Sequence, residues 1–193
     1  MYKILLLVLG WSVISASALA DDGFGVRGGI SWGYGEMENE TQTIKTRDMN
    51  TIEAMALPGY RMGNFLVGAF LDYRRVGQNT KPEEVNNQNL RGGGYLLGVG
   101  SSYSYSTFSF LAAVSFVGQH KLSNKDASGQ EVTYKKPLGF HLGAGMLFMK
   151  SYSADLMLSS VKYSEDELGS TTSDVSANKR AHWNAGLGIS AYF

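Results

Sequence analysis

Apolar side chains recur at every second position through most of the chain after residue 20, and this period of two restricts the fold more than any other feature. In the first run Phe24, Ile30 and Trp32 share one side of the chain, while Arg27 and Ser31 share the other. Such a repeat is that of a β-strand whose two faces meet different surroundings. Comparable runs cover residues 52–61, 65–74, 94–103, 108–119, 138–148, 152–159 and 182–193. The pattern therefore predicts an all-β protein with eight strands.

The connections between these runs alternate in length, which predicts how the strands are arranged. Short turns are expected near residues 63–64, 104–106 and 150–151, and long polar loops at 36–50, 75–90, 120–133 and 163–179. An even number of strands, with short turns at one end and long loops at the other, is typical of a bacterial outer-membrane barrel. We therefore expect an eight-stranded antiparallel up-and-down transmembrane β-barrel, with periplasmic turns and extracellular loops.

The polarity of the two faces distinguishes a membrane barrel from a soluble barrel of the lipocalin kind, which would face water with polar residues. Here one face is almost purely aliphatic and aromatic, whereas the other is mostly Gly, Ser and Ala with isolated charges. An Arg turned toward lipid near the midplane would cost roughly 2–4 kcal/mol. We therefore expect the charged face to line the lumen, with a polar network of Arg27, Glu53, Asp72, Arg74, His141 and Asp155.

The lumen of an eight-stranded barrel is just wide enough for side chains to fill it. We expect the inward charges to pair with one another, because an unpaired buried charge is costly. A narrow channel or a proton path stays an alternative if the network leaves a path for water. The expected pairs are Arg27 with Glu53, Asp72 with Arg74, and His141 with Asp155.

Aromatic residues are expected to form two rings at the membrane surfaces, because Trp and Tyr side chains favour the level of the lipid headgroups. The outer ring is predicted to hold Trp32, Tyr34, Tyr73, Tyr95, Phe116, Tyr134 and Trp183. The inner ring is predicted to hold Phe24, Tyr60, Phe65, Tyr103, Phe108, Phe148, Tyr152 and Phe193.

Residues 1–20 have the pattern of a cleavable signal peptide, and residues 21–193 form the predicted barrel domain. Lys3 precedes an apolar stretch from Ile4, and Ala18-Leu19-Ala20 provides the small residues of a cleavage site. The apolar stretch is shorter than the roughly 20 residues of a membrane-spanning helix. Export by this route predicts a location in the outer membrane. The net charge of zero argues against nucleic-acid binding, which needs a basic surface.

The last strand carries the most specific motif of the sequence. Leu187, Ile189, Ala191 and Phe193 place apolar residues at alternate positions up to a terminal phenylalanine. This motif resembles the C-terminal β-signal of small outer-membrane barrels of the OmpA, OmpX and opacity-protein type, and the resemblance extends over residues 21–193. It implies that the barrel-assembly machinery recognises this strand during membrane insertion. Longer members carry a peptidoglycan-binding domain after the barrel, and we expect none here.

Three histidines, His120, His141 and His182, raise the question of enzymatic activity, because some eight-stranded outer-membrane barrels modify lipid A. One such family has a His-x-Ser-Asn pattern, but His182-Trp183-Asn184 lacks the serine. His120 with Ser123 or Asp126 could imitate the His, Asp and Ser set of another family, although these residue types are common in loops. The histidines are too scattered for a metal site. We expect no catalytic residue, metal or cofactor.

The function expected from the sequence is therefore that of a non-enzymatic surface protein. Loops carry specificity on rigid scaffolds, so its four extracellular loops would contact an external ligand that the sequence does not identify. The other expected partners are outer-membrane lipid and lipopolysaccharide, whose phosphates the acidic run Glu165-Asp166-Glu167 could approach through divalent cations. The alternatives are a narrow ion or solute channel and a lipid A-modifying enzyme.

Overall fold

A computed structural model of the chain describes residues 22–39, 45–78, 90–124, 131–149, 151–168, 171–174 and 180–193. The predicted signal peptide, residues 1–20, lies outside the described residues. The described elements are all strands: β1 (Gly23–Asn39), β2 (Lys45–Met62), β3 (Phe65–Gln78), β4 (Leu90–Tyr105), β5 (Phe108–Asn124), β6 (Glu131–Met149), β7 (Tyr152–Leu168), β8 (Thr171–Asp174) and β9 (Arg180–Tyr192). No helix long and apolar enough to cross a membrane occurs among them.

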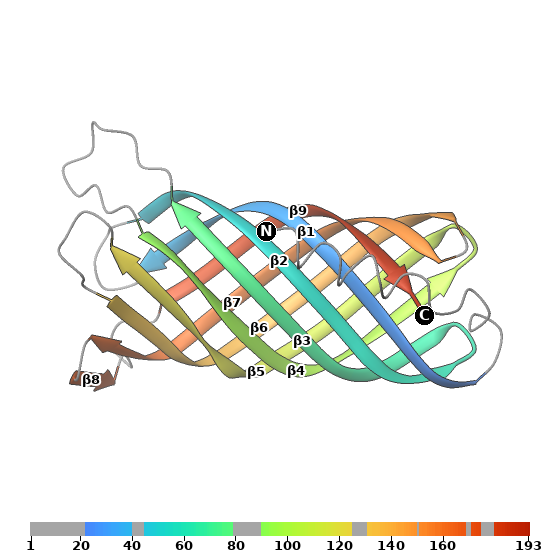
Figure 1. The fold of residues 1–193 in the computed structure, drawn as a ribbon, viewed down its shortest axis with the longest axis horizontal. Coiled ribbons are helices and arrows are strands. Elements are labelled where there is room, and N and C mark those ends of the chain that lie inside the picture. The colour runs from blue at the N-terminus through green and yellow to red at the C-terminus, as the bar shows by residue number, and fades with distance from the viewer. Residues whose placement is uncertain are drawn as a thin grey trace, which may run out of the picture.

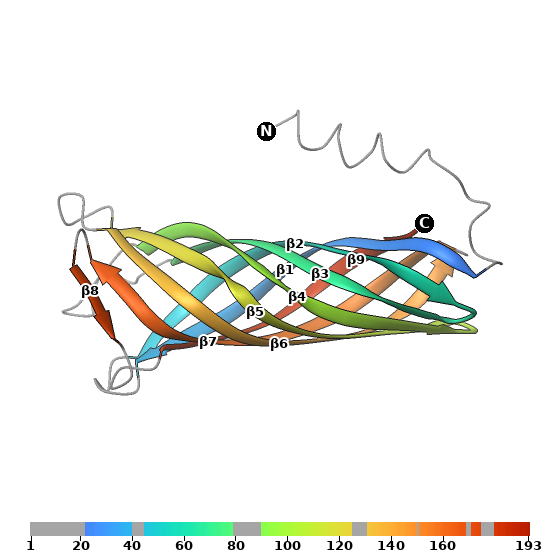
Figure 2. The same ribbon diagram turned by 90° about the horizontal axis from the view of Figure 1, so that it is seen from below.

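The strands form one closed antiparallel sheet (Figure 1). Its order is β6-β5-β4-β3-β2-β1-β9-β7, and pairing of β6 with β7 closes the ring. The short β8 lies outside this ring and pairs with the end of β7, which Figure 2 shows at one end of the barrel. The predicted eight-stranded up-and-down barrel is therefore confirmed. Closure leaves no wall strand with an unpaired edge, as a strand in lipid requires.

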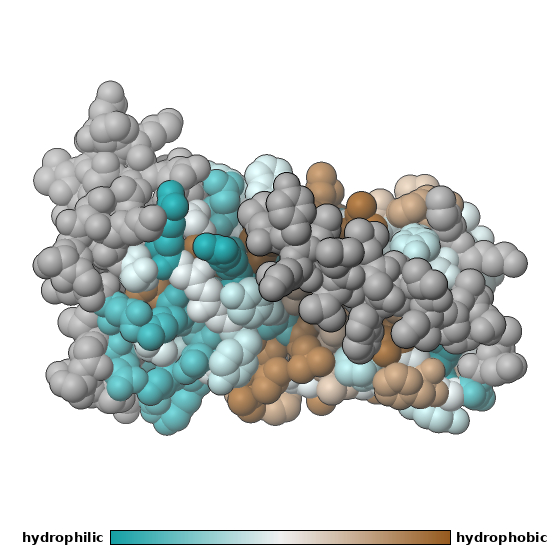
Figure 3. Space-filling view, viewed as in Figure 1, coloured by the Kyte–Doolittle hydropathy of each residue, from teal (hydrophilic) through white to brown (hydrophobic). Residues whose placement is uncertain are grey.

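The outward face of the wall is apolar and the inward face is polar, as the alternation predicts. Leu187 is 70% exposed and Trp32 is 62% exposed, whereas Arg27 and Arg74 are completely buried. In the space-filling view, hydrophobic residues gather toward the middle of the barrel and hydrophilic residues toward the end that carries β8 (Figure 3). A soluble barrel would have the opposite polarity, so these faces are those of a membrane barrel.

The two aromatic rings differ from the prediction at one residue of the outer ring. Tyr134 was expected on the outside but is 2% exposed and lies in the interior. The other predicted members of the outer ring are exposed: Trp32, Tyr34, Tyr73, Tyr95, Phe116 and Trp183. In the inner ring, Phe24, Tyr60, Phe65, Phe108 and Phe148 are exposed, and Tyr103, Tyr152 and Phe193 are half-buried.

The described parts of the predicted long loops 36–50, 75–90, 120–133 and 163–179 are strand, which corrects their assignment. β1 continues to Asn39, and β6 already begins at Glu131. Polar residues face outward there and apolar residues such as Val76, Leu122 and Tyr163 face the interior, so the alternation is the reverse of that in the apolar band. Ion pairs between neighbouring strands bind this part of the wall together: Lys121 with Glu131 at 2.5 Å, Lys135 with Glu167, and Lys136 with Glu165. The barrel wall therefore extends beyond its apolar band.

The short turns lie at the opposite end of the barrel. Gly63-Asn64 joins β2 to β3 as predicted, and Gly63 has the left-handed φ of 56° that such a turn favours. The second turn is at Ser106-Thr107, slightly later than predicted, and Ser106 has a φ of 55°.

A β-bulge in β5 reverses the alternation of that strand. Leu97 pairs with Val117 but Gly98 pairs with Ser115, so one residue of β5 is extra. Phe116 and Val117 are both exposed as a result, and Gly118 follows with a φ of 148°. His120, which was expected in a loop, is therefore inside and 1% exposed. The alternation also breaks near Lys136, whose φ is 51°, and this turns Tyr134 inward.

An arginine in the middle of the apolar band should destabilise the barrel more than one at its edge. Leu142 and Phe148 both point outward from β6 and are 56% and 55% exposed. We expect Leu142→Arg to lower the free energy of unfolding by roughly 2–4 kcal/mol and Phe148→Arg by about 0–1 kcal/mol, because the cost falls toward the interface. Urea titration of the barrel in lipid vesicles measures both values. Equal costs would contradict the placement of the band.

Candidate functional site: the filled interior

A buried ion pair links β1 to β7 near the end that carries the short turns. Arg27 on β1 places Nη2 3.0 Å from Oδ2 of Asp155 on β7, and both side chains are 0% exposed. The Nη1 of Arg27 donates to Ser102 Oγ at 2.9 Å and to the carbonyl of Phe110 at 3.0 Å. The guanidinium also lies 5.1 Å from the centre of the Tyr192 ring. One arginine thus connects strands from opposite sides of the barrel.

Asp155 collects hydroxyl donors in addition to Arg27. Ser109 Oγ donates to its Oδ1 at 3.1 Å, Ser153 Oγ donates to the same atom at 2.9 Å, and Ser190 Oγ donates to Oδ2. A buried carboxylate is tolerated when a cation and several hydrogen bonds compensate for its lost hydration. The small serines leave the space that the Arg27 side chain fills. This cluster is called the lower network below.

A second network surrounds Arg74, which lies between two carboxylates. Its Nε is 3.0 Å from Asp72 Oδ2, and its Nη2 is 3.3 Å from Glu53 Oε1. Nη1 lies 3.3 Å from Nδ1 of His182, which can accept this hydrogen bond in one tautomer. With Arg74, Asp72 and Glu53 ionised, this cluster, called the upper network below, holds one more negative than positive charge.

Neutral donors around Glu53 offset that excess charge. Ser31 Oγ donates to Oε2 at 3.3 Å, while Ser159 Oγ and Asn184 Nδ2 each lie 3.2 Å from Oε1. These residues come from β1, β7 and β9, so one carboxylate links three strands besides its own. The upper network therefore fixes the wall strands relative to one another.

Apolar clusters separate and cover the two networks. β7 shows the order, because Asp155 of the lower network is followed inside the barrel by Met157, by Ser159 of the upper network, and by Val161. The middle cluster contains Leu57, Leu66, Phe70, Leu111, Ala113 and Met157. The outer cluster contains Val76, Leu96, Leu122, Tyr134, Val161 and Tyr163. The described interior is thus filled by alternating polar and apolar layers.

The structure corrects two of the three ion pairs expected from the sequence. Arg27 pairs with Asp155 on β7 instead of Glu53, because the β1–β2 register places Arg27 opposite Leu57, four residues from Glu53. His141 does not pair with Asp155; its Nε2 lies 3.0 Å from Ser115 Oγ and its ring lies 4.6 Å from that of Phe70. The expected pair of Asp72 with Arg74 is present. The serines and Asn184 were not predicted as members of these networks, because their only signal in the sequence is their place on the inward face.

The histidines considered for catalysis are buried inside the barrel. His120 and His182 are each 1% exposed, and Asn184 is 2% exposed. His120 Nδ1 lies 3.5 Å from the Tyr163 hydroxyl, and Asp126 falls outside the described residues. No three metal-ligating side chains cluster in the part of the chain that the structure describes. The described wall therefore presents no histidine to a lipid substrate.

The predicted insertion signal lies on the closing strand. Leu187 and Ile189 point outward and are 70% and 60% exposed, and Ala191 and Phe193 are half-buried. The backbone of Phe193 pairs with Val26 through hydrogen bonds of 2.9 and 2.8 Å. Recognition of this strand by an assembly machinery stays a prediction.

Comparison with known proteins finds similarity in structure but not in sequence. No protein-family model matches the chain, and no curated protein matches its sequence. Ail, the attachment invasion locus protein of Yersinia pestis, superposes with a TM-score of 0.52 at 11% identity, over 90% of this chain and 100% of that one. Neisserial surface protein A gives 0.51 at 16% identity, over 89% and 97%. The shared feature is the fold of the small outer-membrane barrels.

Removing one member of the lower ion pair should destabilise the barrel strongly. Asp155→Asn leaves Arg27 buried without a counter-charge, and we expect it to lower the free energy of unfolding by roughly 3–5 kcal/mol. The double variant Arg27→Met, Asp155→Asn should be less destabilised than the sum of the two single variants, by about 0.5–3 kcal/mol. Urea unfolding in vesicles of all four proteins measures this difference. Additive costs would show that the two side chains do not interact.

Proposed function

We propose that this chain is an outer-membrane protein that acts at the cell surface through the segments joining its strands at the polar end of the barrel. Its fold, which is that of the small outer-membrane barrels, supports this location. The apolar outward face and the two aromatic rings agree with a membrane position. Residues 1–20 would direct export, and the strand ending at Phe193 would be the signal for insertion.

The filled interior is the observation that carries the functional part of the proposal. Two polar networks alternate with two apolar clusters, and most of the side chains in these layers are almost completely buried. A channel needs a continuous path lined by water, and an enzyme needs a site that a substrate can reach. The buried position of the charges and histidines favours neither a channel nor an enzyme. We therefore place the activity at the polar end of the barrel.

The shape of the polar end supports contact with molecules outside the cell. Four connections leave the wall there: residues 40–44, 79–89 and 125–130, and the stretch between β7 and β9 that includes β8. The ion pairs of Lys121, Lys135 and Lys136 stiffen the strands from which these connections emerge. The proposed role is that of a rigid support presenting four segments to a host surface, matrix, phage or neighbouring lipopolysaccharide.

The orientation can be tested by epitope tags in intact cells. A tag inserted within residues 79–89 should be labelled by antibody on unbroken cells, because that connection would be outside. A tag in the Gly63-Asn64 turn should be labelled only after the outer membrane is permeabilised. Both variants should still change gel mobility on boiling, which shows that the barrel has formed. Labelling of the turn in intact cells would reverse the proposed orientation.

The role of the connections can be tested by replacing residues 79–89 and 125–130 with short Gly/Ser segments. We expect binding of the expressing cells to host-cell monolayers or immobilised matrix to fall to the level of cells without the protein. The control is the same replacement at Gly63-Asn64, which should leave binding unchanged. Unchanged binding in the first variant, together with stepwise currents through the purified barrel in planar bilayers, would instead assign the channel function.

A further inference from the structure

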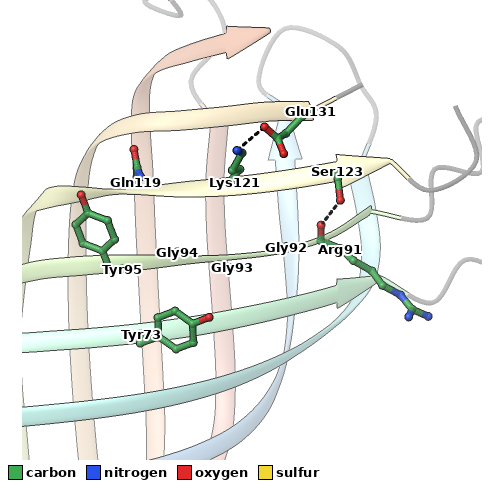
Figure 4. A pocket seen from close by; sticks show the side chains of 10 residues that line it. All are labelled: Tyr73, Arg91, Gly92, Gly93, Gly94, Tyr95, Gln119, Lys121, Ser123 and Glu131. Atoms are coloured by element: carbon green, nitrogen blue, oxygen red, sulfur yellow. Dashed lines mark hydrogen bonds and ion pairs between the residues drawn. The ribbon is translucent and has the colours of Figure 1, made fainter. Parts of the chain in front are cut away.

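A shallow groove lies on the outside of the wall, just beyond the outer aromatic ring on β3, β4 and β5 (Figure 4). It encloses about 370 Å³ and runs along the backbone of Gly92, Gly93 and Gly94. Tyr73 and Tyr95 border it on the side of the apolar band. Since rings of this kind lie at headgroup level, the groove lies where the polar part of an outer-leaflet lipid would be.

The three glycines along the bottom of the groove differ in the direction in which a side chain would point. Gly92 and Gly94 point inward, and a Cβ on either would run into the backbone of β5, so close strand packing requires glycine there. Gly93 points outward, where a Cβ would meet the Arg74 carbonyl at 3.2 Å and the Tyr73 hydroxyl at 3.4 Å. A small side chain would therefore need only slight adjustment at residue 93. Glycine at this position keeps the groove open beside a tyrosine hydroxyl.

On the outer face of β3 and β4, each of two arginines lies opposite a glycine of the neighbouring strand. In the strand register Arg75 pairs with Gly93, and Gly77 pairs with Arg91. A Cβ on Gly77 would meet nothing within 4 Å. Each arginine thus faces an empty position on the neighbouring strand. Arg91 lines the groove, and Arg75 stands beside it, opposite Gly93. The two stand at diagonal positions, roughly 7–8 Å apart between Cα atoms, which allows both guanidinium groups to reach one ligand between them.

Positive charge is in excess in this sector of the wall. Lys121, the partner of Gly93 on β5, forms an ion pair with Glu131. Among the described residues, neither Arg75 nor Arg91 has an ion-pair partner. Three cations and one carboxylate leave an excess of two positive charges. The exposed lysines on β6 differ, because Lys135 and Lys136 are each paired with a glutamate of β7.

We propose that this groove binds a phosphorylated headgroup of an outer-leaflet glycolipid, with the phosphate held between Arg75 and Arg91. The guanidinium group matches phosphate in shape and can form two parallel hydrogen bonds to it. The Tyr73 hydroxyl and the Lys121 ammonium provide further donors at the edge of the groove, and the open positions over Gly77 and Gly93 take the sugar. The proposal rests on the outer-membrane location proposed above.

The test measures binding of fluorescent lipopolysaccharide to the full chain folded in detergent micelles. We expect Arg75→Gln, Arg91→Gln to weaken binding by roughly tenfold or more, because each hydrogen bond between charged groups contributes about that factor. Gly93→Val, which fills the groove and keeps every charge, should also weaken binding. The matched control is Lys162→Gln, which removes one exposed charge on β7, three strands away from β4. Every variant must still change gel mobility on boiling.

Two competitors identify the source of the phosphate. Dephosphorylated lipopolysaccharide should compete poorly with the fluorescent probe, and inorganic phosphate should not compete at millimolar concentration. Equal competition by the dephosphorylated form, or an equal loss of binding in Lys162→Gln, would overturn the proposal. Strong competition by inorganic phosphate would make the groove a site for the free ion and would overturn lipid binding. None of these outcomes changes the expected labelling of the tag in residues 79–89, so the proposed surface function is tested separately.

Discussion

Hydrogen bonding between β1 and β9 joins the first and last wall strands, and the rest of the barrel depends on this seam. Its register runs from Arg27 opposite Tyr192 to Asn39 opposite Arg180. Without it two strand edges would face lipid, where unsatisfied backbone groups are costly. The seam also shapes the interior, because a Cβ on Gly33 would lie 2.6 Å from Oδ1 of Asn184. Glycine on β1 therefore makes room for the amide that donates to Glu53 on β2.

Closure with eight strands leaves a narrow lumen, and the chain fills it in a way that keeps its charges compatible with burial. Arg27 and Arg74 are completely buried, yet both have several polar partners. Arg27 reaches a carboxylate, a hydroxyl and a backbone carbonyl, and Arg74 reaches two carboxylates and an imidazole. The apolar clusters between them exclude water, which strengthens the electrostatic interactions but raises the cost of an unpaired charge. The same interactions that hold the strands in register also close the path through the barrel. Stability of the wall and transport through the lumen are therefore opposed in this molecule.

The wall within the apolar band could be predicted from the sequence, because lipid on one side and a packed lumen on the other impose alternation on every strand. The prediction was wrong where that asymmetry ends. Residues 120–124 and 131–133 were predicted as loop because their outward side chains are polar, but an ion pair between neighbouring strands helps to keep them in the sheet. The bulge at Phe116 and Val117 reversed the expected face of Gln119. The partner of Arg27 could not be predicted, since Asp155 on β7 comes near β1 only because β9 closes the barrel between them.

The groove over Gly93 could not be predicted either, for a related reason. Arg75 fell within the predicted loop 75–90, and Arg91 lay between that loop and the next predicted strand. No strand register could therefore be predicted that would place these arginines opposite Gly93 and Gly77. Close packing against the β5 backbone explains Gly92 and Gly94. The outward position of Gly93 becomes informative only when the neighbouring strands are known.

The bulge in β5 also limits how this sequence can change during evolution. Deletion of one residue from a regularly paired part of a wall strand would exchange the inward and outward faces beyond the deletion, so indels should survive there only in pairs. At Phe116 and Val117 a single deletion would restore regular pairing but turn His120 toward the outside and Gln119 toward the lumen. In a related chain without this extra residue, the positions that carry inward-facing and outward-facing residues should therefore be exchanged in the rest of the strand. The bulge is thus a marker for aligning distant relatives whose sequences share little else.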